Sequence, residues 1–204
     1  MVEEQLLPRG IKDPNIIEAM QTVPRHLFVD DALYGRAYAD HPLPIGGGQT
    51  ISQPYIVAAM TQALQLEGGE RVLEVGTGSG YQAAILSRIC GQVYTVERVN
   101  SLLSRARQVF DRLHYYNIRS KLDDGSAGWA KYQPFDAIIV TAGGPQVPQP
   151  LVEQLRVGGR MVIPVGDQSL QQLQLVEKEA EAVKITTLET VRFVPLLGAH
   201  AWNE

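Results

Sequence analysis

A turn rich in glycine carries the clearest chemical signal in the chain. Gly76, Gly78 and Gly80 alternate directly after the apolar segment Arg71–Val75. Glycine adopts backbone angles that other residues avoid, and it lets the main chain lie against a ligand. In an open parallel sheet, ligands bind beyond the carboxyl ends of the strands. The sequence therefore predicts a ligand site at this turn; the alternative is a tight strand-to-helix turn without a ligand.

The acid before the turn indicates which ligand binds. A dinucleotide fingerprint, G-x-G-x-x-G, requires glycine at position 81, where the chain has Tyr81. Glu74 precedes the first glycine by two positions and would repel a pyrophosphate. The same carboxylate suits a cationic ligand, and S-adenosylmethionine carries an ammonium and a sulfonium group. Glu74 therefore favours this cofactor over a nicotinamide dinucleotide, although an ordinary surface carboxylate is the alternative.

Two further acids end the next predicted strands. Glu97 closes the segment Val93–Glu97, roughly 20 residues beyond the first glycine, where a carboxylate can accept both ribose hydroxyl protons. Asp124, followed by Gly125, comes after the predicted strand Ile118–Leu122 and is placed to receive the adenine amino group. Each acid alone is a weak signal, but three at successive strand ends beside a glycine turn favour a bound nucleoside.

Alternating strands and helices must position these residues. Short apolar strands separated by helices are typical of a parallel sheet that is covered on both faces. The last two strand-like segments have no helix between them, which predicts an antiparallel end. We expect a three-layer, Rossmann-like α/β methyltransferase fold with a mostly parallel twisted sheet and an N-terminal helical addition. The predicted strands are 71–75, 93–96, 118–122, 135–140, 159–165, 170–176 and 183–194, and the predicted helices are 14–20, 54–64, 81–90 and 100–114.

Composition limits the possible partners. The 204 residues carry 18 Lys and Arg against 22 Asp and Glu, a net charge of -4, and the basic residues are scattered. Nucleic acid is therefore an unlikely ligand. The segment Pro42–Leu66 has no charged side chain, but Gly46–Gly48 and three prolines exclude a membrane-spanning helix. We expect one domain over 1–204, in which 1–66 supplies helices and a covering loop and 67–204 the core.

Cysteine and histidine offer little chemistry of their own. The single cysteine, Cys90, permits no internal disulfide and favours a reducing compartment, so we expect a cytoplasmic protein. The first residues lack the pattern of a secretory signal. The four histidines lack the spacing of metal ligands, and no metal is expected. Cys90 is expected to be a small buried hydrophobe.

Six motifs over nearly the whole chain resemble one enzyme family. They are LPIGGGQTISQPYIVAAM (Leu43–Met60), VLEVGTGSGYQAAIL, DDGSAGW, FDAIIVTAG, QLRVGGRMVIPVG and RFVPL. Together they resemble the protein-L-isoaspartate O-methyltransferases. Many methyltransferases share the glycine turn, whereas the stretch Gln49–Pro54 is specific to this family. Asp123 departs from the family's usual Gly-Asp-Gly, which puts the local geometry there in question.

The resemblance implies a reaction and a set of site residues. S-adenosylmethionine would donate a methyl group to the α-carboxylate of L-isoaspartyl residues in damaged proteins and peptides and leave as S-adenosylhomocysteine. The ester then collapses to a succinimide, which hydrolyses partly to aspartate. A monomer is expected. The resemblance assigns Ser52 to the active site, places Thr50, Ile51 and Gln53 beside the substrate, and adds Thr77, Arg98 and Thr141 to the cofactor-binding residues Glu74, Gly76, Gly78, Gly80, Glu97, Asp124 and Gly125.

The predicted chemistry needs orientation more than acid–base catalysis. A carboxylate is ionised at neutral pH and the sulfonium methyl is already activated, so no general base is required. Holding the two groups in line can lower the barrier by about 7 to 11 kcal/mol. Ser52 would orient the substrate carboxylate by donating a hydrogen bond; the alternatives are that it caps the following helix or has a distant partner such as His41.

Two other functions stay open at this point. One is a tailoring enzyme that methylates aspartate in a particular peptide, and the other is a module that binds without catalysis. The intact acids and glycines of the turn disfavour the second.

Overall fold

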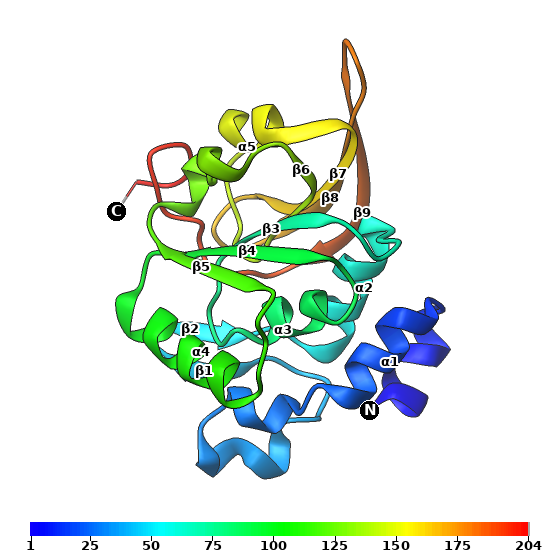
Figure 1. Cartoon of the computed structure of the whole chain (residues 1–204), viewed down its shortest axis with the longest axis vertical. Coiled ribbons are helices and arrows are strands. Elements are labelled where there is room, and N and C mark those ends of the chain that lie inside the picture. The colour runs from blue at the N-terminus through cyan, green and yellow to red at the C-terminus, as the bar shows by residue number, and fades with distance from the viewer. Residues whose placement is uncertain (204) are drawn as a thin grey trace.

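A seven-stranded sheet forms the middle layer of the protein (Figure 1). The computed structural model describes residues 1–203. The strand order is β5-β4-β3-β6-β7-β8-β9, so the direction of chain progression reverses at β3, where a ligand site is expected. The strands are β3 Arg71–Val75, β4 Gln92–Glu97, β5 Ile118–Leu122, β6 Phe135–Val140, β7 Leu155–Gly166, β8 Gln171–Lys178 and β9 Val183–Val191.

The pairing confirms the predicted mixed sheet. Strands β3 to β7 run parallel, and β8 is antiparallel to both β7 and β9. β7 begins at Leu155, four residues before the predicted start. Leu155 pairs with Phe135, and the register then shifts before the strand continues past Gly158, whose φ is +78°. The glycine marks this irregularity inside the strand, whereas the sequence pattern suggested that the strand begins after it.

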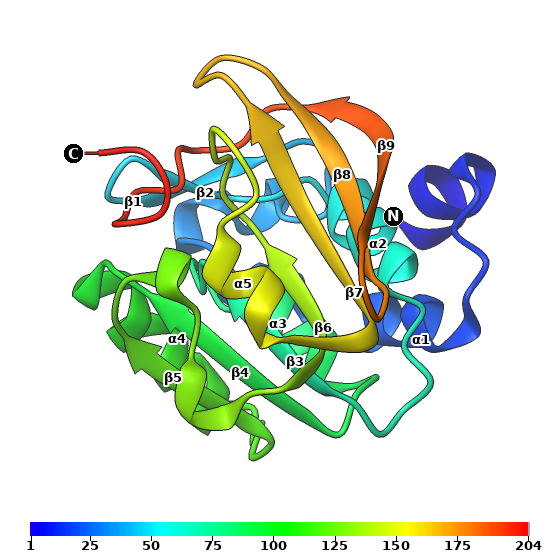
Figure 2. The ribbon, with the colours of Figure 1, turned by 90° about the horizontal axis from the view of Figure 1, so that it is seen from above.

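Helices cover both faces of the sheet (Figure 2). Helices α1 to α4 lie on one face, and α5 lies on the other face against β7. The sequence did not predict α5, because six residues next to Pro148 and Pro150 are too short to show helical periodicity. The predicted ends of α3 and α4 are also corrected: α3 stops at Ser87, and Val99 rather than Asn100 is the N-cap of α4. The helices are α1 Pro14–Thr22, α2 Pro54–Leu64, α3 Tyr81–Ser87, α4 Asn100–Arg112 and α5 Gln149–Gln154, with short 3-10 or π turns at Val2–Leu6, Leu7–Arg9, Arg25–Phe28, Asp31–Arg36, Gly125–Ala127 and Ala130–Tyr132.

Alternate residues of the central strands enter two separate cores. Val72 and Ile139 pack on the side of α2 and α3, whereas Leu73 and Ile138 pack on the side of α5. All four are fully buried, as expected for strands covered on both faces. Glu74 shares the face of Val72 because strand residues two apart point the same way. A Leu73→Ala change would cost about 2 to 5 kcal/mol of stability through the cavity that it leaves.

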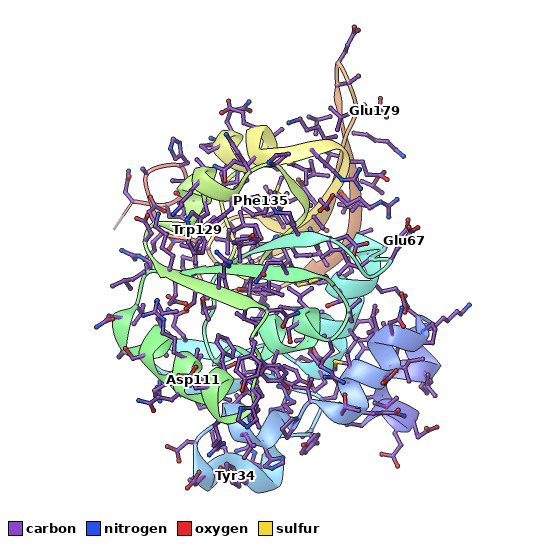
Figure 3. The ribbon with its side chains drawn as sticks, in the orientation of Figure 1. Tyr34, Glu67, Asp111, Trp129, Phe135 and Glu179 are labelled. Carbon is purple, nitrogen blue, oxygen red and sulfur yellow. The ribbon has the colours of Figure 1, made fainter. Side chains whose placement is uncertain are left out.

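An aromatic cluster fills the core on the α5 side beside β4. The ring of Tyr94 lies 5.5 Å from that of Phe135, 5.9 Å from Trp129 and 4.6 Å from Tyr132, between ring centroids. Trp129 and Phe135 are close together in Figure 3. Such offset and edge-to-face contacts add about 0.5 to 1.5 kcal/mol each beyond area burial. They fix the chain that follows Asp124 and Gly125 against the sheet.

The uncharged segment folds over one end of the sheet as a small hairpin. Strands β1 (Leu43–Gly46) and β2 (Gln49–Ile51) are antiparallel, and all three glycines between Ile45 and Gln49 have positive φ. Arg105 of α4 donates to the carbonyl oxygen of Ile45 and ties the hairpin to the core. Of the helices in residues 1–203, none combines the length and apolar character needed to cross a membrane.

Candidate active site

A cleft of about 890 Å³, including solvent at its mouth, opens at the carboxyl ends of β3, β4 and β6. Hairpin β1–β2 and the chain after β9 supply its other walls. The predicted residues that line it are Thr50, Ile51, Ser52, Gly76, Thr77, Gly78, Glu97, Arg98, Gly125 and Thr141.

The glycine loop is held tightly against its neighbours. Gly76 has a φ of +97°, and a Cβ there would lie 2.5 Å from Thr141 Oγ1, which donates to the carbonyl oxygen of Gly76. Gly80 has a φ of +87°, and a Cβ there would lie 2.6 Å from the ring of Phe110. Gly80 therefore shapes the loop from beneath and does not line the cleft. Both contacts are with the protein's own side chains, and the predicted close approach of a ligand to this turn stays a prediction.

Glu97 ties the loop to the end of β4. Its Oε2 accepts from the amide of Gly78 at 2.8 Å, and its Oε1 accepts from the amides of Arg98 and Val99, both at 2.9 Å. An ionised carboxylate can accept about four hydrogen bonds, and the described residues 1–203 fill three of them on this side chain, which lines the cleft. Its predicted contact with ribose stays a prediction.

Glu74 lies beneath the loop, fully buried, and does not line the cleft. This excludes the surface-carboxylate alternative. Burial raises the pKa of Glu74 to about 8. The hydrogen bond that Thr95 Oγ1 donates to Oε2 at 2.5 Å acts in the opposite direction and lowers it. Its Oε1 has no hydrogen-bond partner among residues 1–203. The predicted attraction between Glu74 and a cationic ligand would therefore act from below the loop, and it stays a prediction.

Asp124 lies beyond Glu97 in an adjoining cavity that Arg98 also lines. Its Oδ1 accepts from the amide of Ser126 at 2.8 Å and caps the turn Gly125–Ala127. The additional acid, Asp123, is exposed and pairs with Lys121. The departure from the family motif thus leaves Asp124 at the turn, and Asp123 forms an ion pair with the side chain of Lys121.

The segment before α2 brings three of the four predicted substrate residues to the cleft. Thr50, Ile51 and Ser52 line it, whereas the side-chain amide of Gln53 donates to Asp40 Oδ2 at 2.7 Å, away from it. The N-cap of α2 is Gln53, and no side chain caps this helix. The alternative of Ser52 as a helix cap is therefore wrong. A contact between Gln53 and substrate stays a prediction.

A buried arginine supports Ser52 from behind. Arg25 is fully buried, and its Nη2 donates to the carbonyl oxygen of Ser52 at 2.7 Å. Its Nε donates to the carbonyl oxygen of Ala37 at 2.7 Å, and its guanidinium lies 4.7 Å from the centroid of the Tyr81 ring. Burial lowers the pKa of Arg25, and Tyr81 opposes the shift. Sequence reasoning missed this residue because arginine is rarely buried and no local pattern marked it.

The chain after β9 also lines the cleft, a role the sequence did not reveal. Val194, Pro195, Leu196 and Leu197 form part of its wall. Gly143, just after β6, fixes this stretch: its amide donates to Val194 and its carbonyl oxygen accepts from Leu196, both at 2.8 Å. The sequence signals for this stretch were the family motif RFVPL, Arg192–Leu196, and its apolar character, and neither assigned it to the cleft.

Histidine and cysteine add no reactive group to the cleft. The Nδ1 of His41 lies 3.0 Å from the carbonyl oxygen of Pro42, and its ring does not line the cleft. Among residues 1–203, no three His, Cys, Asp or Glu side chains gather as metal ligands. Cys90 is buried, as predicted, and burial raises the pKa of its thiol to about 12.

Comparisons with known proteins agree on one family. Residues 1–201 match the family model of protein-L-isoaspartate(D-aspartate) O-methyltransferase. The protein-L-isoaspartate O-methyltransferase of Desulfosudis oleivorans is 61% identical over 204 residues, which cover all of this chain and 92% of that protein. The enzyme of the same name from Desulfotalea psychrophila is 59% identical over 203 residues, covering all of this chain and 95% of that protein.

Two solved structures share the fold over almost the whole chain. One, a protein-L-isoaspartate O-methyltransferase, superposes with a TM-score of 0.88 at 29% identity and covers 96% of this chain and 64% of that one. The other, from Plasmodium falciparum, was solved in complex with S-adenosyl-L-homocysteine. It has a TM-score of 0.82 at 26% identity and covers 95% of each chain.

Proposed function

The chain belongs to the protein-L-isoaspartate(D-aspartate) O-methyltransferase family, and from this premise we propose how its cleft works. The protein is a repair methyltransferase that uses S-adenosylmethionine and methylates the α-carboxylate of L-isoaspartyl residues. The ester closes to a succinimide, whose hydrolysis returns part of the damaged chain to normal aspartate.

One observation carries the assignment of the site. The glycine loop and Glu97 face the same cleft as Thr50, Ile51 and Ser52, from the segment that distinguishes this family from other methyltransferases. A nucleoside-type site and a site for the acceptor peptide therefore share one cavity. Methyl transfer requires this arrangement, because donor and acceptor must meet in line.

The described residues fit the cofactor in three respects. The glycines permit close approach of the backbone, and Glu97 keeps one acceptor position for a ribose hydroxyl. The unpartnered Oε1 of Glu74 leaves an acceptor oxygen with partial negative charge under the loop, which suits a cation above it; the carboxyl carries a full charge only above its raised pKa of about 8. When bound, S-adenosylmethionine supplies an electrophilic methyl group on a positively charged sulfur.

The protein's own residues then supply orientation. Ser52 donates a hydrogen bond from its hydroxyl to one oxygen of the substrate carboxylate and leaves the other oxygen free to attack the methyl carbon. A carboxylate is already deprotonated at neutral pH, so no residue has to remove a proton. The apolar wall formed by Val194 and Leu196 excludes water and strengthens these polar interactions.

The broader assignments are part of the same proposal. Residues 1–66 act as the helical addition and covering loop, and 67–204 act as the core. The protein acts on damaged proteins and peptides, as a monomer in the cytoplasm, without nucleic acid or membrane. The buried, unpaired thiol of Cys90 supports a reducing compartment such as the cytoplasm. The lack of charge in Pro42–Leu66 supports its role as the segment that receives the substrate.

The products of a single incubation test the proposed repair. The wild-type protein, S-adenosylmethionine and an isoaspartyl peptide should give first a methyl ester, then a succinimide and finally the normal aspartyl peptide. Mass spectrometry and chromatography detect the three products. A stable ester, or no aspartyl product after repeated rounds, would contradict repair even if methyl transfer occurs.

A further inference from the structure

The C-terminal tail, residues 197–202, lies against the acid assigned to adenine. The amide of Ala199 donates to Asp124 Oδ2 at 2.7 Å. The amide of His200 donates to Ser126 Oγ at 3.1 Å, and that hydroxyl donates to Asp124 Oδ1 at 2.7 Å. Residues more than seventy positions apart in sequence thus meet on one carboxylate.

The tail can reach this carboxylate because it has no side chain at one position. A Cβ on Gly198 would lie 2.1 Å from Asp124 Oδ1 and 2.5 Å from Ser126 Oγ. Real Cβ atoms do not approach oxygen so closely, so any larger residue must push the tail away. Its φ lies outside the left-handed range, so alanine at this position would change the contact rather than strain the backbone.

A second anchor closes the tail on itself. The indole N–H of Trp202 donates to the carbonyl oxygen of Gly143 at 3.1 Å, and the amide of Gly198 donates to the carbonyl oxygen of Trp202 at 3.1 Å. Gly143 also fixes Leu196 in the wall of the cleft. The tail is therefore anchored to Gly143 through Trp202 and to Asp124 through Ala199.

These contacts define which acceptor positions of Asp124 are used. Oδ1 accepts two hydrogen bonds, both from Ser126, and Oδ2 accepts one, from Ala199. Each carboxylate oxygen can accept two, so the described residues 1–203 leave one position open on Oδ2. Burial acts to raise the pKa of Asp124, but the hydrogen bonds from Ala199 and Ser126 outweigh it and the pKa is lowered. The group is thus an ionised acceptor held in one orientation.

The tail also walls the cavity in which that acceptor lies. Leu197, Gly198, Ala199 and Trp202 line it together with Asp124, and it shares Arg98 and Leu197 with the main cleft. A nucleoside whose ribose lies at Glu97 would extend its base past Arg98 into this space. The tail is therefore placed beside the base and not beside the transferred methyl group.

We propose that residues 197–202 are a positioning element for the nucleobase: they hold the Asp124 carboxylate so that its open acceptor position selects the 6-amino group of adenine. This inference rests on the proposed function, because it takes S-adenosylmethionine as the ligand. It assigns purine selectivity to a segment that lies against Asp124. Loss of the tail contact should weaken only the part of the affinity that depends on the 6-amino group.

Binding of two ligands to matched variants tests the proposal. The ligands are S-adenosylhomocysteine and its analogue with unsubstituted purine in place of adenine, measured by calorimetry. The wild type should bind S-adenosylhomocysteine about tenfold or more tightly than the analogue, as expected for a hydrogen bond to a charged group. Gly198→Ala should reduce that ratio to below about threefold by weakening S-adenosylhomocysteine alone. Trp202→Phe, which keeps an aromatic but smaller side chain and loses the N–H, should reduce it in the same direction.

The outcomes separate the two proposals. Gly35→Ala is the control, because a Cβ there meets nothing within 4 Å and the ratio should not change. If Gly198→Ala and Trp202→Phe keep the wild-type ratio, or weaken both ligands equally, the tail does not position Asp124 for adenine. If the wild type binds neither ligand and methylates no isoaspartyl peptide, the proposed function itself fails.

Discussion

Arg25 donates from Nη2 to the backbone carbonyl oxygen of Ser52 across 2.7 Å, so a buried cation holds the residue assigned to orient the substrate. Its second hydrogen bond, to Ala37, fixes the guanidinium between two loops of the N-terminal region. Arg25 acts on Ser52 through the backbone and lies outside the cleft. It is therefore a positioning residue.

Replacing Arg25 should separate substrate orientation from cofactor binding. Arg25→Met leaves two carbonyl oxygens without their donors, and we expect a loss of about 2 to 4 kcal/mol of stability in urea unfolding. In the folded fraction, methylation of an isoaspartyl peptide should fall at least tenfold, with the affinity for S-adenosylhomocysteine within twofold of wild type. Arg36→Met, at an exposed position, is the matched control. Unchanged turnover per folded molecule would show that Arg25 only stabilises the fold.

Ser52→Ala should lower turnover without loss of the cofactor. Removing one hydrogen bond to a charged group costs about 1.5 to 3 kcal/mol, which corresponds to a fall of roughly 10- to 100-fold in kcat/KM. Calorimetry with S-adenosylhomocysteine should give an affinity within twofold of wild type, since Ser52 lies on the substrate side of the cleft. Ser101→Ala, on the exposed face of α4, should change neither quantity. Wild-type turnover in Ser52→Ala would remove Ser52 from the mechanism.

Glu97→Gln should have the opposite effect. The amide retains nearly the same shape but loses the negative charge that strengthens hydrogen bonds from Gly78 and from ribose. We expect the affinity for S-adenosylhomocysteine to fall about 10- to 100-fold, with a smaller change in kcat at saturating cofactor. Glu67→Gln, at an exposed position (Figure 3), serves as the control. A loss of kcat at unchanged cofactor affinity would contradict the ribose assignment.

Glu74 should make stability depend on pH. Its pKa is about 8 in the folded protein against 4.5 in the unfolded chain, so the folded state binds the extra proton between these values. The stabilising contribution is fully present below about pH 4.5 and is lost as pH rises through about 8. Glu74→Gln should therefore become more stable than wild type above about pH 8, by on the order of a few kcal/mol. Urea unfolding of both proteins from acidic to alkaline pH measures this difference, and parallel pH profiles would show that the pKa of Glu74 does not differ between the folded and unfolded states.

The sequence predicted the core of the fold and much of the site, for physical reasons. Strands that are covered on both faces, such as Arg71–Val75, carry mainly apolar residues, and a glycine turn needs glycines, so both features are visible locally. Glu97 and Asp124 were found because parallel strands end at one edge of the sheet. The buried Glu74 was placed correctly in the strand, but its burial beneath the loop depends on Thr95 and α3, which no local pattern reveals.

Other features depended on contacts between distant segments. The support of Ser52 by Arg25 crosses 27 positions, and the contact of the tail with Asp124 crosses 75. Neither contact has a period or a motif. Helix α5 was missed because it is too short to show helical periodicity. The hairpin β1–β2 was missed because it contains a run of three glycines, a pattern that is typical of a loop.

The central claim is that this cleft recognises the isoaspartyl linkage itself. The direct test incubates the wild-type protein and labelled S-adenosylmethionine with two peptides that differ only in whether one residue is linked as isoaspartyl or as aspartyl. The account predicts label in the isoaspartyl peptide and none above background in the other. Equal labelling of the two peptides would contradict it and would indicate a general aspartyl methyltransferase.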